Sequence, residues 1–450
     1  MTHQAQKCAQ APGHHDNLKA WLLCLAYAML GLWLYAFEPS LPFGSGVTSQ
    51  QIGMWLCMAL LMGLWMLRTV PALFGVLLTL LVMSLFGLAP VSTLLAGAAN
   101  DAVLWWLGAL SLSVAARESG LLGWLVVQAS QRLGKTDNAP ALLRCTPAVV
   151  WLTLAFAMLP SPRQAAQWRH IFNQLPGTPR QTGLNIAATA QLCACLAWLP
   201  AHPANLLVLA LLPSGGLDRF APLHWWLHTW PLLVLAIALG IYGQWHSRNR
   251  QPANILTQTA LTDTQEERFA MRSVAGIALI SVLATALQPF HGIAPGLLSV
   301  FAVVALFALH CITPASLQYK TDWPLFVSAT VLPGLITSFA QALPEFHSLL
   351  SNNFEPGLLL PAMLCLRTIL PARALMLLSL VLGLAWSAQY DQDLLEWAMP
   401  ILVALHLTEF MLHCLSQHQG CWQRIRAILQ SPLVWLGCPV YYLWCKWYGW

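Results

Sequence analysis

The chain has 450 residues, of which 58% are hydrophobic and only 8% charged, and its mean hydropathy is +0.63. This composition excludes an ordinary soluble protein and predicts an all-α, polytopic membrane protein. The net charge is +5, but the cations flank apolar segments, so they indicate helix orientation in the lipid bilayer and no nucleic-acid partner.

A polar leader at residues 1–18 comes first, and we expect it in the cytoplasm. No small-residue cleavage site closes the next apolar run, which favours a retained first helix over a signal peptide. Because a spanning helix needs about 20 apolar residues, we expect roughly ten to thirteen crossings or half-crossings. The candidate spans are 19–37, 51–67, 69–90, 102–116, 141–159, 184–212, 223–245, 270–287, 293–311, 324–343, 357–383, 397–416 and 430–449.

A hydrophilic linker at 246–269 divides the chain, and its arginines place it in the cytoplasm. The flanking segments, 19–245 and 270–450, are predicted to be two transmembrane repeats. Interrupted apolar segments recur in both, with hairpins expected near 141–182 and 344–370. Paired interruptions of this kind indicate the midplane binding site of a transporter, although polytopic proteins without repeats also contain proline and polar kinks.

The segment from Leu159 to Asn205 is the most informative, because Pro160, Ser161, Pro162 and Arg163 interrupt an apolar run and polar residues then recur up to Asn205. Backbone N–H and C=O groups at membrane depth must be bonded internally, so irregular backbone there is buried in protein or lines a polar cavity. In transporters such cavities hold the substrate.

Short motifs follow one another in a recognisable order. They are Val70-Pro71 between paired apolar segments, Asn100–Leu110, Glu118–Leu122, Leu159–Ala165, Leu199–Leu206, Ser351–Pro356, Trp386–Asp391 and the aromatic run Tyr441–Gly449. Their order resembles that of the divalent anion:sodium symporter family, especially its bacterial dicarboxylate and citrate–succinate exchanger branch. The resemblance covers most of residues 47–450, but each functional motif departs from the family pattern.

The resemblance implies an inverted repeat around two re-entrant hairpins, as in other ion transporters, and a homodimer. It implies secondary transport of small organic or inorganic anions such as dicarboxylates, by an elevator-type alternating-access mechanism. The positions that match the family's substrate-binding residues are Ser161, Arg163, Asn205, Ser351, Asn352, Asn353 and Tyr390. Ser161, Asn205 and Ser351 also match ion-binding positions. No metal or cofactor is implied, and coupling to sodium or to protons is left open.

Arg163 departs most from the family, which has threonine at this position of the first hairpin tip. A guanidinium there repels sodium but binds a carboxylate in bidentate fashion, which favours a sodium-independent anion carrier. The alternative is that Arg163 lies at the end of the hairpin and extends to water.

Other functions remain open at this stage. His202 either titrates in the site or is a hydrogen-bonded structural residue. The twelve cysteines are interpreted as small buried hydrophobes.

We do not expect an enzyme, because no HExxH motif, nucleophile elbow or phosphate-binding glycine loop occurs, and nothing groups His224, His228 or His406. The stronger rival is a membrane scaffold or assembly partner that kept a transporter fold and lost its site.

Overall fold

The computed structural model describes residues 48–67, 70–125, 128, 141–157, 180–212, 225, 229–238, 265–343, 363, 366, 370–390, 394, 398, 401–403, 405–406 and 439. All regular elements in these residues are helices, in agreement with the expected all-α class. The chain forms two compact units, 1–98 with 323–354 and 369–397, and 99–322 with 355–368 and 398–450. Each unit draws on segments from both sides of the linker, and the boundaries of the expected repeat stay a prediction.

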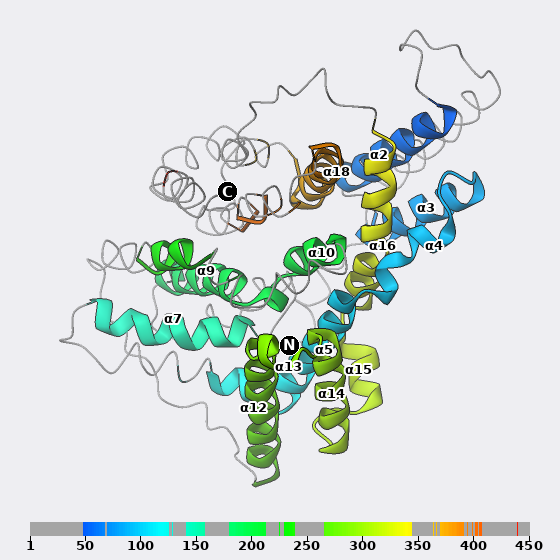
Figure 1. Cartoon of the computed structure of the whole chain (residues 1–450). Helices are drawn as coiled ribbons and strands as arrows, with labels where there is room; N and C mark the ends of the chain where they lie inside the picture. Colours follow the sequence, from blue (N-terminus) through cyan, green and yellow to red (C-terminus); the bar gives the residue numbers. More distant parts are fainter. Residues whose placement is uncertain are drawn as a thin grey trace, which may run out of the picture. The chain divides into compact units, whose positions relative to one another are not determined.

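The first unit is built from α2 (Ser49–Leu67), α3 (Ala72–Leu85), the short α4 (Val91–Leu94), α16 (Trp323–Gln341) and α18 (Ala372–Tyr390). Pro71 is the N-cap of α3, so the Val-Pro step of the sequence separates α2 from α3. The helix α16 packs against α2, α3, α4 and α18, and Figure 1 shows it in yellow beside the blue helices.

Close backbone contacts hold α16 in this unit. A Cβ added to Gly334 would meet the backbone carbonyls of Thr93 and Leu94, and a Cβ added to Gly97 would meet the carbonyl of Thr330. Glycine is required here because the two backbones approach closely. Small residues at helix contacts are typical of membrane helices, where close van der Waals packing drives association.

The second unit contains α5 (Asp101–Glu118), α7 (Ala141–Ala157), α9 (Arg180–Ala197), η3 (Leu199–Ala201), α10 (Pro203–Leu211), α12 (Gln265–Ala286), α13 (Gln288–His291), α14 (Pro295–Ala308) and α15 (Pro314–Lys320). The helices α5 and α14 pack against each other and lie side by side in Figure 1. Gly108 makes this possible, because a Cβ there would collide with the side chain of Ser299. The pair α7 and α9 also packs together.

Two helices among the described residues are long and apolar enough to cross a membrane by length and composition, Arg268–Ala286 and Trp323–Gln341. Shorter apolar helices of 10–17 residues lie at Gln50–Met66, Ala72–Leu85, Thr229–Ala238, Pro295–Ala308 and Ala372–Ala388. The expectation of ten or more crossings stays a prediction.

Candidate functional site at a helix break

The interruption predicted between Leu159 and Asn205 is present at its carboxy-terminal end. The helix α9 ends at Ala197, Trp198 is extended, η3 follows, and α10 begins at Pro203. Two prolines explain the break. Pro200 has no N–H to donate to the carbonyl of Leu196, and Pro203 favours the extended conformation that His202 adopts, with φ −137° and ψ 133°.

The carbonyls at the end of α9 are bonded by side chains from other segments. The Nδ2 of Asn205 donates to the carbonyl of Cys195 at 3.0 Å. The carbonyl of Leu196 accepts from Trp225 Nε1 at 2.6 Å and from Thr229 Oγ1 at 2.8 Å. Because these groups are buried, the bonds replace those that a continuous helix would have made.

The first turn of α10 is capped by its own His202. The Ala204 N–H donates to His202 Nδ1 at 3.2 Å, and the Asn205 N–H donates to the His202 carbonyl at 3.1 Å. Pro203 has no N–H and occupies the first helical position, where proline is favoured. Since His202 Nδ1 accepts a hydrogen bond, it carries no proton, so the neutral ring has its proton on Nε2.

His406 completes the cluster. Its Nε2 lies 2.8 Å from Asn205 Oδ1, and its ring is T-shaped against that of His202 with centroids 4.7 Å apart. Because the amide nitrogen of Asn205 faces the Cys195 carbonyl, its Oδ1 is the acceptor and His406 Nε2 is the donor. The exposed fractions of Asn205, His406 and His202 are 1%, 3% and 8%. A buried polar cluster thus joins α9, α10 and the segment around 401–406.

The grouping of His406 corrects the sequence interpretation, which found no partner for it. His406 and Asn205 are 201 positions apart, so no local spacing brings them together. His224 and His228 lie outside the described residues.

Of the predicted site residues, the structure places Asn205 in the break. Ser161, Arg163, Ser351, Asn352 and Asn353 lie outside the described residues. Tyr390 is the last residue of α18 in the first unit, and its side chain lies outside the description. The structure therefore does not test whether these side chains form one site with Asn205.

The amino-terminal turn of α5 contacts the chain on both sides of the break. Asn100 caps α5 through Oδ1, which accepts from the Ala102 N–H at 2.9 Å, while its Nδ2 donates to the carbonyl of Ala210 in α10 at 3.0 Å. One helical turn further on, Trp105 makes a T-shaped contact with Trp198, with ring centroids 6.1 Å apart. The start of α5 thus contacts both sides of the interruption.

Asp101 links α5 to α14. Its Oδ2 accepts from the Gly296 N–H at 3.0 Å, so it caps α14, whose own N-cap residue is Ala294. Asp101 precedes the predicted span 102–116. Burial raises the pKa of its carboxyl, and the Gly296 N–H partly lowers it.

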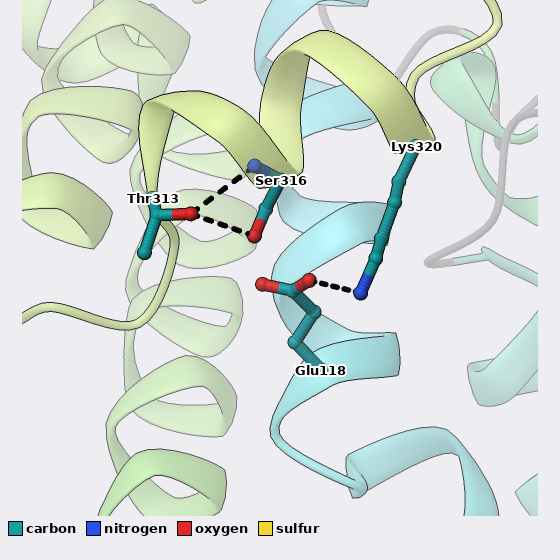
Figure 2. A network of polar contacts seen from close by, with 4 residues as sticks. All are labelled: Glu118, Thr313, Ser316 and Lys320. Atoms are coloured by element: carbon teal, nitrogen blue, oxygen red, sulfur yellow. Dashed lines mark hydrogen bonds and ion pairs between the residues drawn. The ribbon is translucent and has the colours of Figure 1, made fainter.

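The other end of α5 carries a separate polar network (Figure 2). Glu118 pairs with Lys320 of α15, and Thr313 caps α15 by accepting from the Ser316 N–H at 3.1 Å. Burial lowers the pKa of Arg117, which follows the predicted span, and the Asp322 carboxylate partly raises it. Because Lys320 is 55% exposed, we interpret this network as a helix end facing water.

The chemistry of the break is that of neutral hydrogen-bonding groups. Within the described part of the chain, no three His, Cys, Asp or Glu side chains are grouped to hold a metal ion. The buried side chains in that part include no Asp, Glu, Lys or Arg. Among them, His202 and His406 are the imidazole side chains.

Comparison of the sequence with protein-family models found no match. Comparison with curated proteins also found no match.

Proposed function

We propose that the chain is a secondary active transporter for small anions such as dicarboxylates, working by elevator-type alternating access in a bacterial inner membrane. The observation that carries this proposal is the break between α9 and α10, where extended backbone and the side chains of Asn205, His202 and His406 are buried in an apolar helical unit. At membrane depth, irregular backbone of this kind is found where it is enclosed by protein or lines a cavity. The resemblance to the divalent anion:sodium symporter family supports the same function and a homodimeric assembly.

Apolar outer faces support the membrane part of the proposal. On α12, the side chains of Phe269, Leu279 and Ile280 are more than half exposed, and on α14 so are Phe301 and Val304. Large apolar surfaces of this kind are unfavourable in water and favourable against lipid tails. A bilayer is the partner that these faces fit.

The proposed transporter does not use sodium. A sodium site needs several oxygen ligands, yet the Leu196 carbonyl already accepts from both Trp225 and Thr229, and Asn205 Oδ1 and the Cys195 carbonyl each already accept one hydrogen bond, which leaves fewer oxygen lone pairs for a cation. Arg163, where the family has threonine, adds a positive charge that favours an anion over a cation.

Transport is tested with purified protein in liposomes loaded with unlabelled succinate. We expect external radiolabelled succinate to accumulate by counterflow, with malate, citrate and sulfate as competitors, and the rate to be the same with and without a sodium gradient. Arg163→Ala should weaken competition by anions. Uptake that requires a sodium gradient would contradict the sodium-independent mechanism.

A matched pair of variants tests the site itself. Asn205→Asp keeps an acceptor for His406, adds a negative charge in the break and loses the donor to the Cys195 carbonyl. Counterflow of a dianion, measured on protein whose thermal unfolding shows that it is folded, should fall by about tenfold or more, equivalent to about 1.4 kcal/mol. Gln51→Glu is the control, because Gln51 Oε1 accepts from the Thr48 N–H in the other unit and glutamate keeps that bond. Equal losses in both variants would argue against a site at Asn205.

The second candidate function is a non-transporting scaffold. Its support is that the polar groups of the break bond to one another, as in the pairs Asn205–Cys195 and Ala204–His202, so the break is stable without a ligand. Thermal unfolding in detergent separates the two functions. A transporter should be stabilised by at least one anion of the panel, since a ligand that binds the folded state raises its stability. No shift with any anion, together with normal membrane insertion and no counterflow, would favour the scaffold.

A further inference from the structure

We propose that the elbow of the α12–α14 hairpin, residues 287–294, is inserted in the bilayer leaflet opposite the 246–269 linker, at the boundary between lipid headgroups and acyl chains. Its partner is lipid and not a second protein chain, and a bridge made by His291 across the turn lets the elbow enter lipid. This inference rests on the membrane location in the proposed function, and it adds the part of the chain and the leaflet that are involved.

Charge and connectivity orient the hairpin. Between Arg272 and Lys320 the sequence contains no Asp, Glu, Lys or Arg. Because α12 and α14 pack together and the elbow between them is short, α14 runs back along α12. Arg272 and Lys320 therefore lie towards the same end of the hairpin, and the positive-inside rule places that end in the cytoplasm with the linker. The elbow faces the other leaflet.

The length of α12 brings the elbow to that leaflet. The helix has 22 residues, from Gln265 to Ala286. At 1.5 Å per residue it is about 33 Å long, close to the hydrocarbon thickness of about 30 Å. A helix that begins at a cytoplasmic linker therefore ends near the opposite headgroups.

The elbow exposes large apolar side chains. Phe290 is 87% exposed, and Leu287 and Ile293 are exposed beside it in the sequence. Exposed Ile280 in α12 and Phe301 in α14 add apolar surface on the two helices that the elbow joins. Such a surface is unfavourable in water, and acyl chains bury it. Lipid fits it better than a second chain, because contacts between membrane helices favour small residues.

The backbone of the elbow is bonded in the way that lipid requires. The Gly292 N–H donates to the carbonyl of Gln288 at 2.8 Å. The His291 ring bridges the turn, because Nδ1 accepts from the Ile293 N–H at 3.0 Å and Nε2 lies 2.7 Å from the carbonyl of Ala284. Since Nδ1 accepts, the neutral ring has its proton on Nε2 and donates it to that carbonyl. In water the solvent would bond to these groups, whereas in lipid only the protein can do so.

Asp101 sets the depth of the elbow end of α14. Its Oδ2 accepts from the Gly296 N–H at 3.0 Å, in the first turn of α14. Asp101 is half-buried, and an ionisable carboxyl at the centre of a bilayer is costly. The first turn of α14 therefore lies near the headgroups, which argues against a re-entrant hairpin that turns back at the bilayer centre.

The depth of position 290 tests the inference without any transport. Trifluoromethylphenylalanine replaces Phe290 in the full chain, which is reconstituted in nanodiscs of phosphatidylethanolamine and phosphatidylglycerol. The ¹⁹F relaxation is measured with a nitroxide lipid labelled near the headgroup, with one labelled at the chain end, and with a gadolinium chelate in the water. The same probe at Phe301 and at Tyr319, which are also exposed, gives the matched standards for lipid and for water.

The three positions should respond differently. Phe301 lies about 9 Å beyond Pro295 along the axis of α14, so the chain-end nitroxide should relax it most. Tyr319 precedes Lys320 at the opposite end of the hairpin, so the chelate should relax it most. We expect the headgroup nitroxide to relax position 290 about threefold or more faster than the chelate does, because the probe lies inside a hydrocarbon boundary that the chelate does not cross.

Three results would overturn the inference. Strongest relaxation of position 290 by the chelate would place the elbow in water. Strongest relaxation by the chain-end nitroxide would place it at the bilayer centre. No relaxation by lipid or chelate would place it against protein, as in contact with a second copy.

The second arm tests the His291 bridge with the same probe at position 290. His291→Leu leaves the Ala284 carbonyl and the Ile293 N–H without the ring, so the elbow should move towards water and relaxation by the chelate should rise about threefold or more. His291→Gln keeps a donor and an acceptor and should retain wild-type relaxation. His310→Leu is the matched control, because His310 is also exposed but lies beyond the other end of α14. Unchanged relaxation in His291→Leu would contradict the bridge.

These results are independent of succinate counterflow. A chain that exchanges succinate but holds position 290 in water contradicts this inference and leaves the proposed function in place. A chain that holds position 290 at the headgroup boundary but shows no counterflow contradicts the proposed function and supports the inference.

Discussion

Two proline-containing helical regions behave differently in this protein. At Pro200 and Pro203 the chain leaves the helix between α9 and α10, whereas α16 continues from Trp323 to Gln341 through Pro333. In the break, the freed carbonyl of Leu196 accepts hydrogen bonds from Trp225 and Thr229, which are distant from it in the sequence. In α16 the hydroxyls bond within their own helix, as Thr337 does to the carbonyl of Pro333 at 2.9 Å. A single proline therefore leaves α16 continuous, whereas two prolines three positions apart accompany the end of α9 and the start of α10.

Asn205→Leu tests the break and should have the largest effect on stability, because it removes two buried hydrogen bonds. Leucine has similar size but leaves the Cys195 carbonyl and His406 Nε2–H without their present partner, at about 2 kcal/mol each, so the free energy of unfolding should fall by about 4 kcal/mol. Thermal unfolding in detergent measures this. Thr79→Val is the control, since Thr79 bonds to the carbonyl of Gly75 in its own helix. Similar losses in both variants would show that the break does not depend on Asn205.

Gly334→Val tests the continuous region. Its side chain would collide with the backbone carbonyls of Thr93 and Leu94, which cannot rotate away, so we expect a loss of about 3 kcal/mol in the free energy of unfolding. Gly276→Ala in α12 meets nothing within 4 Å and should be neutral or stabilising by up to about 1 kcal/mol. Equal melting temperatures for the two variants would contradict the close approach of α16 to α4.

Asn100 tests how much the contact between α5 and α10 contributes to stability, because its side chain both caps α5 and donates a hydrogen bond to α10. Asn100→Ala removes both bonds and should cost about 2 kcal/mol. Asn100→Ser keeps a good cap but does not reach the carbonyl of Ala210, so its cost should be about 1 kcal/mol. Unfolding of the two variants in denaturant measures the difference. If both cost the same, the bond to α10 does not contribute.

Asp101 gives the smallest effect and one that depends on pH. Because burial raises its pKa in the folded state, its contribution to stability is present below the unfolded pKa of about 3.9 and is lost as the pH rises through the higher folded pKa. Asp101→Asn keeps an oxygen acceptor for the Gly296 N–H and removes the charge. The variant should therefore be at least as stable as the wild-type protein at pH 7, and its advantage should shrink towards pH 4.

Melting temperatures of both proteins across this range give the test. Glu118→Gln is the control, because Glu118 pairs with the exposed Lys320. An advantage of Asp101→Asn that grows as the pH falls would contradict the raised pKa.

Much of the fold followed from local sequence signals. The apolar segments predicted near 51–67, 102–116, 293–311 and 324–343 correspond to α2, α5, α14 and α16, because hydrophobic runs of this length form helices in most environments. The interruption before Asn205 was also predictable, since proline has no N–H and restricts the residue before it. The packing of the helices against one another was not predictable from the sequence, because the approach of α5 to α14 depends on Gly108 and Ser299, which are nearly 200 positions apart.

Local residue patterns were enough to predict the helical class and the position of the break, since both depend on residues close together in the chain. The chemistry of the break depends on contacts between distant segments. Asn205 was predictable as a polar residue there, but its partner His406 comes from the far end of the chain. A hydrogen bond of 2.8 Å between distant segments depends on how the helices pack, and no spacing in the sequence encodes that distance.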